Sequence, residues 1–467
     1  MNNRIILFLL ALTFFVQSCY KDDTSGANRE LATIQVDLGF PEKATIDLGL
    51  NEEYVLKPVV EQKGNSSLSY EWEVDYKLVS SEKDFSFKSA RLGSFPVRLK
   101  VSNQDGSVFK EFRIRVNSQY EEGLLILAEN AEQEGTLSFI PKKEGKFLSL
   151  TNIEDVDINS FEKSNPGDKL GKKPTDIAVR VNQIFISSEV GRISALNYKT
   201  LELEAVIESP DFPDFQPVFM NIPDSEAKSS MILNRSGKVY NLATLEHVVS
   251  TNSTAGTKVF ELKTQMLPTQ NYTSGFFWEP ATSIFHNLWT RNANSGTRLN
   301  DQNMITFFAY GDNCYTLTSS KSNPSIIRKT NFSEQRLAFI EESTFTNTNL
   351  TLKSDSKTLL VGELNYLAYT NGRSIYKWYY TTNNIPTSPY ITLDIPGVIT
   401  SMAKTPAKEV GKDDLDPIKE LYVAVYDENA TGLKGSVVVY DLETGIKKAT
   451  YANISDKPVK IFFKKRK

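Results

Sequence analysis

The chain has 467 residues, 40% of them hydrophobic, and a formal net charge of −4, so it can bury a sizeable core and lacks the basic surface of a nucleic-acid-binding protein. Two cysteines and two histidines leave little material for a Cys/His metal site or for nucleophilic catalysis with a histidine base. The 27 Phe and 20 Tyr residues favour strands over helices.

The first segment, residues 1–18, has the layout of a secretory signal peptide. Arg4 supplies a positive charge, and the apolar run over residues 5–16 is too short, at about 1.5 Å per residue, to cross the roughly 30 Å core of a bilayer. Cys19 follows a small residue, which resembles a bacterial lipobox, where the cysteine is lipidated and becomes the new N-terminus. Gln17 departs from the small residue usual at its position. An ordinary signal peptide followed by an unmodified cysteine is the alternative.

The residues after Cys19 resemble an export signal. Lys21, Asp22 and Asp23 are similar to the lysine/acidic signal that sends Bacteroidetes lipoproteins to the outer face of the outer membrane. Several acyl chains anchor a protein stably, because each buried CH₂ contributes about 0.8 kcal/mol. We therefore expect residues 19–30 to form a lipidated tether on the outer membrane, facing the extracellular side. A plain polar segment is the alternative.

Alternating apolar and polar residues predict a β-sandwich over residues 31–118. Strands are expected at residues 32–38, 54–60, 69–74, 95–101 and 107–116. Pro58 indicates an edge or a bulge, and residues 103–106 (Asn-Gln-Asp-Gly) indicate a turn. About seven short strands with Trp72 near the middle are typical of an Ig-like fold, in which this side chain lies in the core.

The same segment resembles a PKD domain. Residues 70–72 (Tyr-Glu-Trp), 93–101 and 105–106 (Asp-Gly) are similar to the Y-x-W motif, the G-x-Y-x-V-x-L-x-V strand and the D/N-G hairpin of that family. Phe95 stands where Tyr is usual, and residues 74–77 (Val-Asp-Tyr-Lys) replace the acidic-glycine loop. The segment is therefore PKD-like and not a standard member.

From residue 119 onward a unit recurs in which an apolar strand, a polar turn with Gly or Asn and an alternating strand follow one another. Such units occupy residues 175–196, 229–242, 304–317, 365–378 and 420–440. Repeats of roughly 40–50 residues built from short strands are typical of a β-propeller. We expect an all-β chain in which residues 119–467 form a β-propeller of about seven blades. A pair of sandwiches and a β-helix are the alternatives.

Together these features resemble the PKD-like lipoproteins of Bacteroidetes. The resemblance implies a surface accessory or binding protein associated with an outer-membrane nutrient uptake system, whose partners would be a transporter complex and a glycan or peptide ligand. It implies no catalytic residues. An adhesion or scaffold protein that binds other surface proteins is the alternative.

No catalytic or metal-binding motif is evident. G-x-S-x-G, H-E-x-x-H and P-loop patterns are absent from the sequence. Asp155, Asp157 and Asn159 alternate as in a calcium loop but lack its glycine, and a solvated strand face explains them equally. We expect no enzyme activity, no cofactor and no metal; a propeller hydrolase or lyase using carboxylates alone is the less favoured alternative.

Two aromatic clusters are the candidate ligand-binding residues. Trp278 and Trp289 lie in or beside a segment rich in Asn, Thr and Ser, and Trp378, Tyr379 and Tyr380 precede Thr-Thr-Asn-Asn. Exposed aromatic faces beside amide side chains suit stacking on sugar rings or packing on a peptide. Packing within the propeller core is the alternative.

Overall fold

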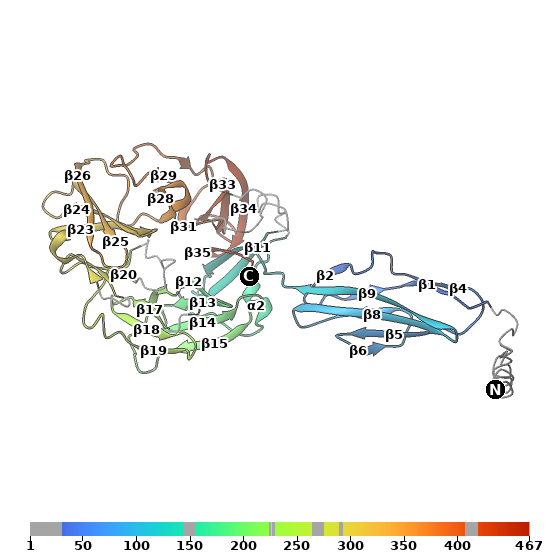
Figure 1. Ribbon diagram of the computed structural model, residues 1–467. Coiled ribbons are helices and arrows are strands. Elements are labelled where there is room, and N and C mark those ends of the chain that lie inside the picture. The colour runs from blue at the N-terminus through green and yellow to red at the C-terminus, as the bar shows by residue number, and fades with distance from the viewer. Residues whose placement is uncertain are drawn as a thin grey trace, which may run out of the picture. The chain divides into compact units, whose positions relative to one another are not determined.

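The computed structural model describes residues 30–142, 155–223, 226, 229–263, 275–288, 293–406 and 419–466. The chain forms two compact units, a first unit of residues 1–118 and a second unit of residues 119–467, and strands dominate both (Figure 1). Within the ranges just given, no helix is long and apolar enough to span a membrane. Cys19, Lys21, Asp22 and Asp23 lie outside the described residues.

The first unit contains a five-stranded sheet of order β2-β9-β8-β5-β6. Its strands are β2 (Thr45–Gly49), β5 (Ser69–Val74), β6 (Lys77–Ser80), β8 (Gly93–Asn103) and β9 (Gly106–Asn117). β2 runs parallel to β9, and the other neighbours are antiparallel. The long strands β8 and β9 form its centre (Figure 1).

The strand expected over residues 54–60 is interrupted in the structure. Two small sheets pair β1 (Ile34–Asp37) with β4 (Val59–Gln62) and β3 (Tyr54–Leu56) with β7 (Phe85–Phe87). Pro58 lies between β3 and β4. Because proline has no N–H to donate, it ends one ladder, and the chain starts the next with a different partner.

Trp72 is the centre of the first unit's core, as the sequence predicts. Its side chain is fully buried and stacks on Phe85 with 4.6 Å between ring centroids. The indole nitrogen donates a hydrogen bond to the Glu82 carbonyl at 3.1 Å. The ring is therefore buried with its polar atom paired, as a buried tryptophan requires.

The second unit consists of seven small sheets within the described residues, which follow one another around the unit in a propeller-like arrangement (Figure 1). The first joins β10 (Gly123–Glu129), β11 (Gly135–Pro141) and β35 (Lys457–Lys464). The second sheet comprises β12 (Pro174–Arg180), β13 (Gln183–Ser188), β14 (Arg192–Asn197) and β15 (Leu203–Glu208). The third comprises β16 (Pro217–Asn221), β17 (Ser229–Asn234), β18 (Val239–Ala243) and β19 (Val248–Thr251). The fourth comprises β20 (Phe276–Glu279), β21 (Ile284–Asn287) and β22 (Ala293–Asn294). The fifth sheet comprises β23 (Gln302–Tyr310), β24 (Asn313–Ser320), β25 (Ile326–Ser333) and β26 (Phe339–Thr346). The sixth comprises β27 (Thr358–Val361), β28 (Tyr366–Asn371), β29 (Ser374–Trp378) and β30 (Ile391–Thr392). The seventh comprises β31 (Val398–Lys404), β32 (Glu420–Tyr426), β33 (Gly435–Asp441) and β34 (Lys447–Ser455).

The final strand, β35, completes the first sheet of this unit by pairing antiparallel with β10. Side chains tie it to strands of two neighbouring sheets. Lys460 forms an ion pair with the buried Asp176 of β12 at 2.7 Å, and Ser401 of β31 accepts a hydrogen bond from the Ile461 N–H at 3.2 Å. The buried Lys464 amine donates to the Glu121 carbonyl at 3.0 Å. These contacts close the unit.

Two turns between the outer strands share one construction, which reflects the repeated pattern in the sequence. The Asn197 side-chain oxygen accepts the N–H groups of residues 199 and 200 at 2.8 and 3.1 Å. The Asp441 carboxylate accepts those of residues 443 and 444 at 3.0 and 2.9 Å. Each turn then passes through a residue with positive φ, Leu201 or Gly445. Such side-chain capping favours Asn and Asp at these positions.

Candidate functional site

Three of the aromatic residues expected to contact a ligand are core residues instead. Trp278, Trp378 and Tyr380 are almost completely buried, so they cannot offer an exposed face, and the prediction that they do is wrong. Trp289 lies outside the described residues. Tyr379 is 51% exposed. Side chains alternate between the faces of an extended segment, so residues 378 and 380 point inward together and residue 379 points outward.

Tyr379 borders a cluster of side chains that satisfy one another. Its ring meets the Tyr366 ring edge-on with centroids 6.0 Å apart. The Lys377 amine lies 4.9 Å from the Tyr366 ring centroid and 3.5 Å from that of Tyr390, and it donates to the Glu443 carbonyl at 2.7 Å. Burial lowers the pKa of Lys377 to about 8. The cluster joins neighbouring sheets, and Tyr379 is the exposed aromatic ring at its border.

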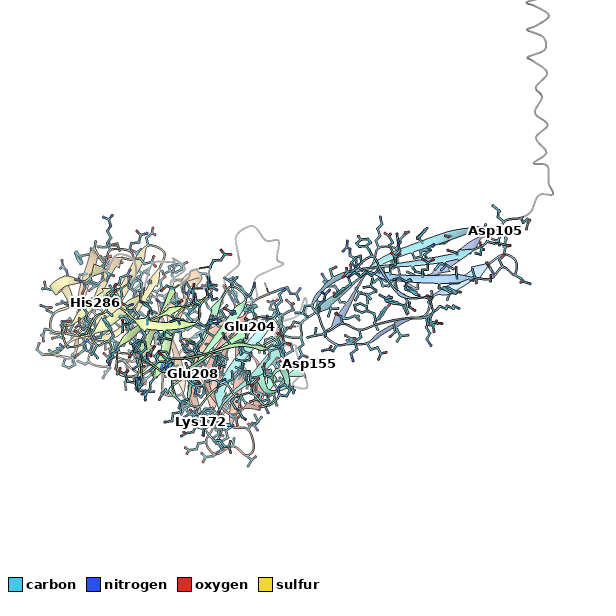
Figure 2. All side chains as sticks on the ribbon, turned by 90° about the horizontal axis from the view of Figure 1, so that it is seen from below. Asp105, Asp155, Lys172, Glu204, Glu208 and His286 are labelled. Atoms are coloured by element: carbon cyan, nitrogen blue, oxygen red, sulfur yellow. The ribbon has the colours of Figure 1, made fainter. Side chains whose placement is uncertain are left out.

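His286 is a structural histidine in the second unit (Figure 2). Its Nε2 atom lies 2.8 Å from a Glu279 carboxylate oxygen, and both side chains are buried. The edge of its ring faces Phe260, with centroids 5.6 Å apart. Burial lowers its pKa, although the hydrogen bond to Glu279 acts in the opposite direction. This pair lies in a packed interior.

The possible calcium loop has other contacts. Asp157 accepts a hydrogen bond from the Tyr120 hydroxyl at 2.7 Å and forms an ion pair with Lys163. The segment forms an isolated bridge at Asp157, next to the short helix α2 (Ser160–Ser164), instead of a strand. In the part of the chain that the structure describes, no group of three or more His, Cys, Asp or Glu residues is placed to hold a metal ion.

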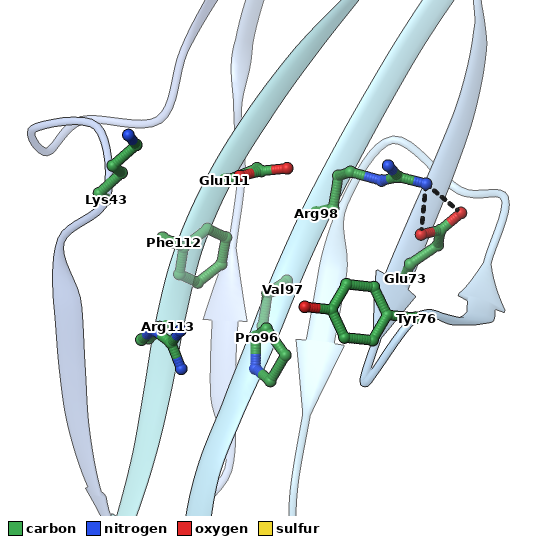
Figure 3. Close-up of a pocket in the computed structure, with 9 residues that line it drawn as sticks. All are labelled: Lys43, Glu73, Tyr76, Pro96, Val97, Arg98, Glu111, Phe112 and Arg113. Carbon is green, nitrogen blue, oxygen red and sulfur yellow. Dashed lines mark hydrogen bonds and ion pairs between the residues drawn. The ribbon is translucent and has the colours of Figure 1, made fainter.

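A groove lies on the outer face of the five-stranded sheet of the first unit (Figure 3). It encloses about 250 Å³ and is open to one side. We call it the sheet groove. Its lining is Lys43, Glu73, Tyr76, Pro96, Val97, Arg98, Glu111, Phe112 and Arg113.

Strand register brings the polar members of this lining together. Arg98 of β8 lies opposite Glu111 of β9 on one side and Glu73 of β5 on the other. Pro96, two residues before Arg98, lies opposite Arg113. Directly opposed side chains have Cβ atoms about 4.5–5.5 Å apart, so three strands place four charged groups on one patch.

The charges in the groove are only partly neutralised. Arg98 forms an ion pair with Glu73 at 2.8 Å and lies over the Phe109 ring, 5.5 Å from its centroid. The hydrogen bond that Arg98 donates to the Glu73 carboxylate raises the already high pKa of Arg98. Among the described residues, neither Lys43 nor Arg113 has a side-chain ion pair. Two cationic groups are thus free to meet an external anion.

Tyr76 stands at the rim of the groove on a strained turn. It joins β5 to β6 together with Asp75, and both residues have positive φ, 62° and 50°. Tight hairpin turns of this kind favour Asn or Asp followed by Gly, so Asp75 suits its position, whereas Tyr76 costs roughly 1–2 kcal/mol there. Tyr76 is 82% exposed, so its ring is available to a partner.

Sequence reasoning missed the sheet groove. Residues 95–101 and 107–116 carry a signal, because charged side chains occupy the positions between the core residues of both strands. That outer face becomes a site only when Glu73 and Tyr76, from elsewhere in the chain, are placed beside it. The turn at residues 75 and 76 supplies this rim through Tyr76.

Comparisons with known proteins give a limited result. No family model matches the chain, and no curated protein matches it. One similar solved structure is a quinonprotein alcohol dehydrogenase-like protein from Bacteroides thetaiotaomicron, 15% identical, with 93% of this chain and 99% of that chain covered and a TM-score of 0.48. Others are the computationally designed Ika8 protein (7% identity, 74% and 94% covered, TM-score 0.39) and a chain of the mitotic checkpoint complex (9% identity, 61% and 81% covered, TM-score 0.39). These likenesses identify neither a family nor an activity for this chain.

Proposed function

We propose that this protein is a lipid-anchored outer-membrane protein, exposed on the cell surface, that binds a ligand for a nutrient uptake system and performs no catalysis. The observation that carries the proposal is the sheet groove, where unpaired cations and an exposed tyrosine converge on one patch. The segment 16–23 supports the membrane address. In this proposal, Cys19 carries the lipid, and Lys21, Asp22 and Asp23 direct export.

The two units have separate parts in this proposal. The first unit is a PKD-like sandwich that presents the groove close to the anchor in sequence. The second unit is a β-propeller of seven blades, supported by its seven small sheets and by the pairing of β35 with β10. Its broad surface would contact an outer-membrane transporter.

An adhesion or scaffold role is the second candidate, and β6 favours it. β6 is an edge strand that pairs only with β5 among the described strands. Leu78 and Val79 are 61% and 54% exposed on it. An exposed apolar edge can add a strand from another protein.

The membrane address is tested by protease treatment of intact cells. Wild-type protein should be degraded from outside, and the Cys19→Ala variant should leave the membrane fraction. A Lys21→Ala/Asp22→Ala/Asp23→Ala variant should remain in the membrane but become resistant to the protease. If the wild type resists digestion on intact cells and is digested only after lysis, the surface location is wrong.

The binding role is separated from the scaffold role by two assays on the purified mature chain. Calorimetric titration with pools of oligosaccharides and peptides should detect binding of a ligand. Arg113→Gln should lower the affinity for that ligand. Capture of surface proteins that is abolished by Leu78→Lys/Val79→Lys, without any ligand in the pools, would favour the scaffold role. Product release from an oligosaccharide would contradict the non-enzymatic assignment.

A further inference from the structure

Two cations in the sheet groove differ from the other cations of the same sheet face. Arg98, Lys100 and Arg115 each pair with a carboxylate, at 2.8, 2.8 and 2.6 Å. Lys43 and Arg113 pair with none of the described residues. These two cations therefore remain available to an anion from outside the chain.

Backbone hydrogen bonds fix the positions of these two cations. The Lys43 N–H donates to the Glu111 carbonyl at 3.0 Å, and the Arg113 N–H donates to the Ala44 carbonyl at 2.9 Å. Lys43 therefore lies beside Glu111, and Arg113 lies two residues further along β9, level with Thr45, at the other end of the groove (Figure 3). A guanidinium offers parallel N–H donors that match both oxygens of a carboxylate, and an ammonium adds a point charge.

The other groups in the groove suit a hydroxylated ring. Tyr76 offers an exposed aromatic face with a hydroxyl at its end. Its turn is held against the sheet because the Asp75 N–H donates to the Pro96 carbonyl at 3.0 Å. Glu111 and Glu73 provide acceptors for hydroxyl groups. Three strands about 4.8 Å apart make the patch about 10 Å wide.

The position of the groove within the sheet argues against an extended peptide. Peptides in extended form usually add a strand to a free edge, where backbone groups are unpaired. The groove lies over β5, β8 and β9, each of which has a strand on both sides. Recognition must therefore come from side chains.

From these observations we propose that the sheet groove binds a carboxylate-bearing glycan, an oligosaccharide that contains uronic acid. The carboxylate meets the Arg113 guanidinium and a sugar ring packs on Tyr76. Lys43 adds positive charge at the other end of the groove, where Glu111 accepts hydrogen bonds from sugar hydroxyls. This inference rests on the proposed binding function and specifies its ligand class.

The test is calorimetric titration of the full mature chain, carrying Cys19→Ala for solubility, with oligogalacturonate and with its methyl ester. The acid form should bind at least tenfold more tightly than the ester, and 0.5 M salt should weaken it. Arg113→Gln should reduce affinity about ten- to hundredfold, since charged hydrogen bonds are lost. Lys43→Gln and Tyr76→Ala should each reduce it by a smaller factor.

Arg115→Gln is the matched control. Arg115 lies on the same strand and the same face, but it pairs with Asp47 outside the groove, so affinity should stay unchanged. Circular dichroism of each variant shows whether the sheet is intact. An equal loss of affinity in Arg113→Gln and Arg115→Gln would mean that the ligand does not bind in the sheet groove.

Other outcomes separate this inference from the proposed function. Equal binding of the ester and the acid overturns the carboxylate assignment and leaves a glycan-binding protein. Equal binding of an oligoglutamate, with the same dependence on Arg113, overturns the glycan assignment. Absence of binding to any oligosaccharide or peptide, with wild-type protein folded, overturns both the inference and the binding function.

Discussion

Replacement of Trp378 by alanine should lower the free energy of unfolding much more than replacement of its neighbour Tyr379. Trp378 is fully buried, its ring meets Phe308 edge-on at 6.3 Å, and its indole nitrogen donates to the Thr382 carbonyl at 3.3 Å. Removing a buried tryptophan costs about 3–5 kcal/mol. Tyr379 is half exposed and has one edge contact, with Tyr366, so its removal costs about 1 kcal/mol or less.

The assay is urea denaturation of the mature chain followed by far-ultraviolet circular dichroism, which does not depend on the tryptophan that is removed. The two units can unfold in separate transitions. Trp72→Ala destabilises the first unit and so identifies its transition. Trp378→Ala, in the second unit, should leave that transition unchanged. The difference between the two alanine variants should be at least about 2 kcal/mol, roughly 30-fold in the unfolding constant. A Tyr379→Ala variant as unstable as Trp378→Ala would refute the assignment of Trp378 to the core and Tyr379 to the surface.

Asp176→Asn should destabilise the second unit by about 1–3 kcal/mol, because the buried Asp176 loses the charge that pairs with the partly exposed Lys460 and accepts the Met220 N–H. Asp394→Asn, whose ion pair is exposed on both sides, should cost under about 1 kcal/mol in the same denaturation assay. Burial holds the pKa of His286 below its ordinary value of 6.5. As the pH falls through 6.5, this histidine is therefore protonated in the unfolded chain but still neutral in the folded chain, which stabilises the unfolded state. Thermal stability of the second unit should therefore decrease from pH 7 to pH 5, and the slope should flatten in His286→Gln but persist in His247→Asn. Burial raises the pKa of the Cys314 thiol well above its ordinary value, so with Cys19 replaced, a thiol reagent should react only after unfolding; rapid labelling of native protein would contradict the buried position.

Local alternation predicts much of the fold but not which face of a strand meets solvent. The three neighbours Trp378, Tyr379 and Tyr380 were expected together at a ligand, although only Tyr379 is exposed. However, sheets in the second unit are covered on both faces, as the fully buried β20 shows. An aromatic residue on either face can therefore be core, which is why Trp278 could not be assigned from its sequence neighbours.

The sheet groove was beyond sequence reasoning for a different reason. It depends on the register that sets Glu73 beside Arg98 and Arg98 beside Glu111. A shift of one residue would exchange the core and solvent faces of a strand. The partners of Arg98 lie on strands before and after it in the chain, and no local pattern states how they align.

The pairing of β35 with β10 has a consequence for the order of events in the cell. Because β35 follows every other strand of the second unit in the chain, the first sheet of this unit stays incomplete until residues 457–464 have been synthesised. Until then the β10 edge is open and apolar, the kind of edge that pairs with other chains. A chain truncated before residue 457 would keep the strands of every other sheet and still be prone to aggregate.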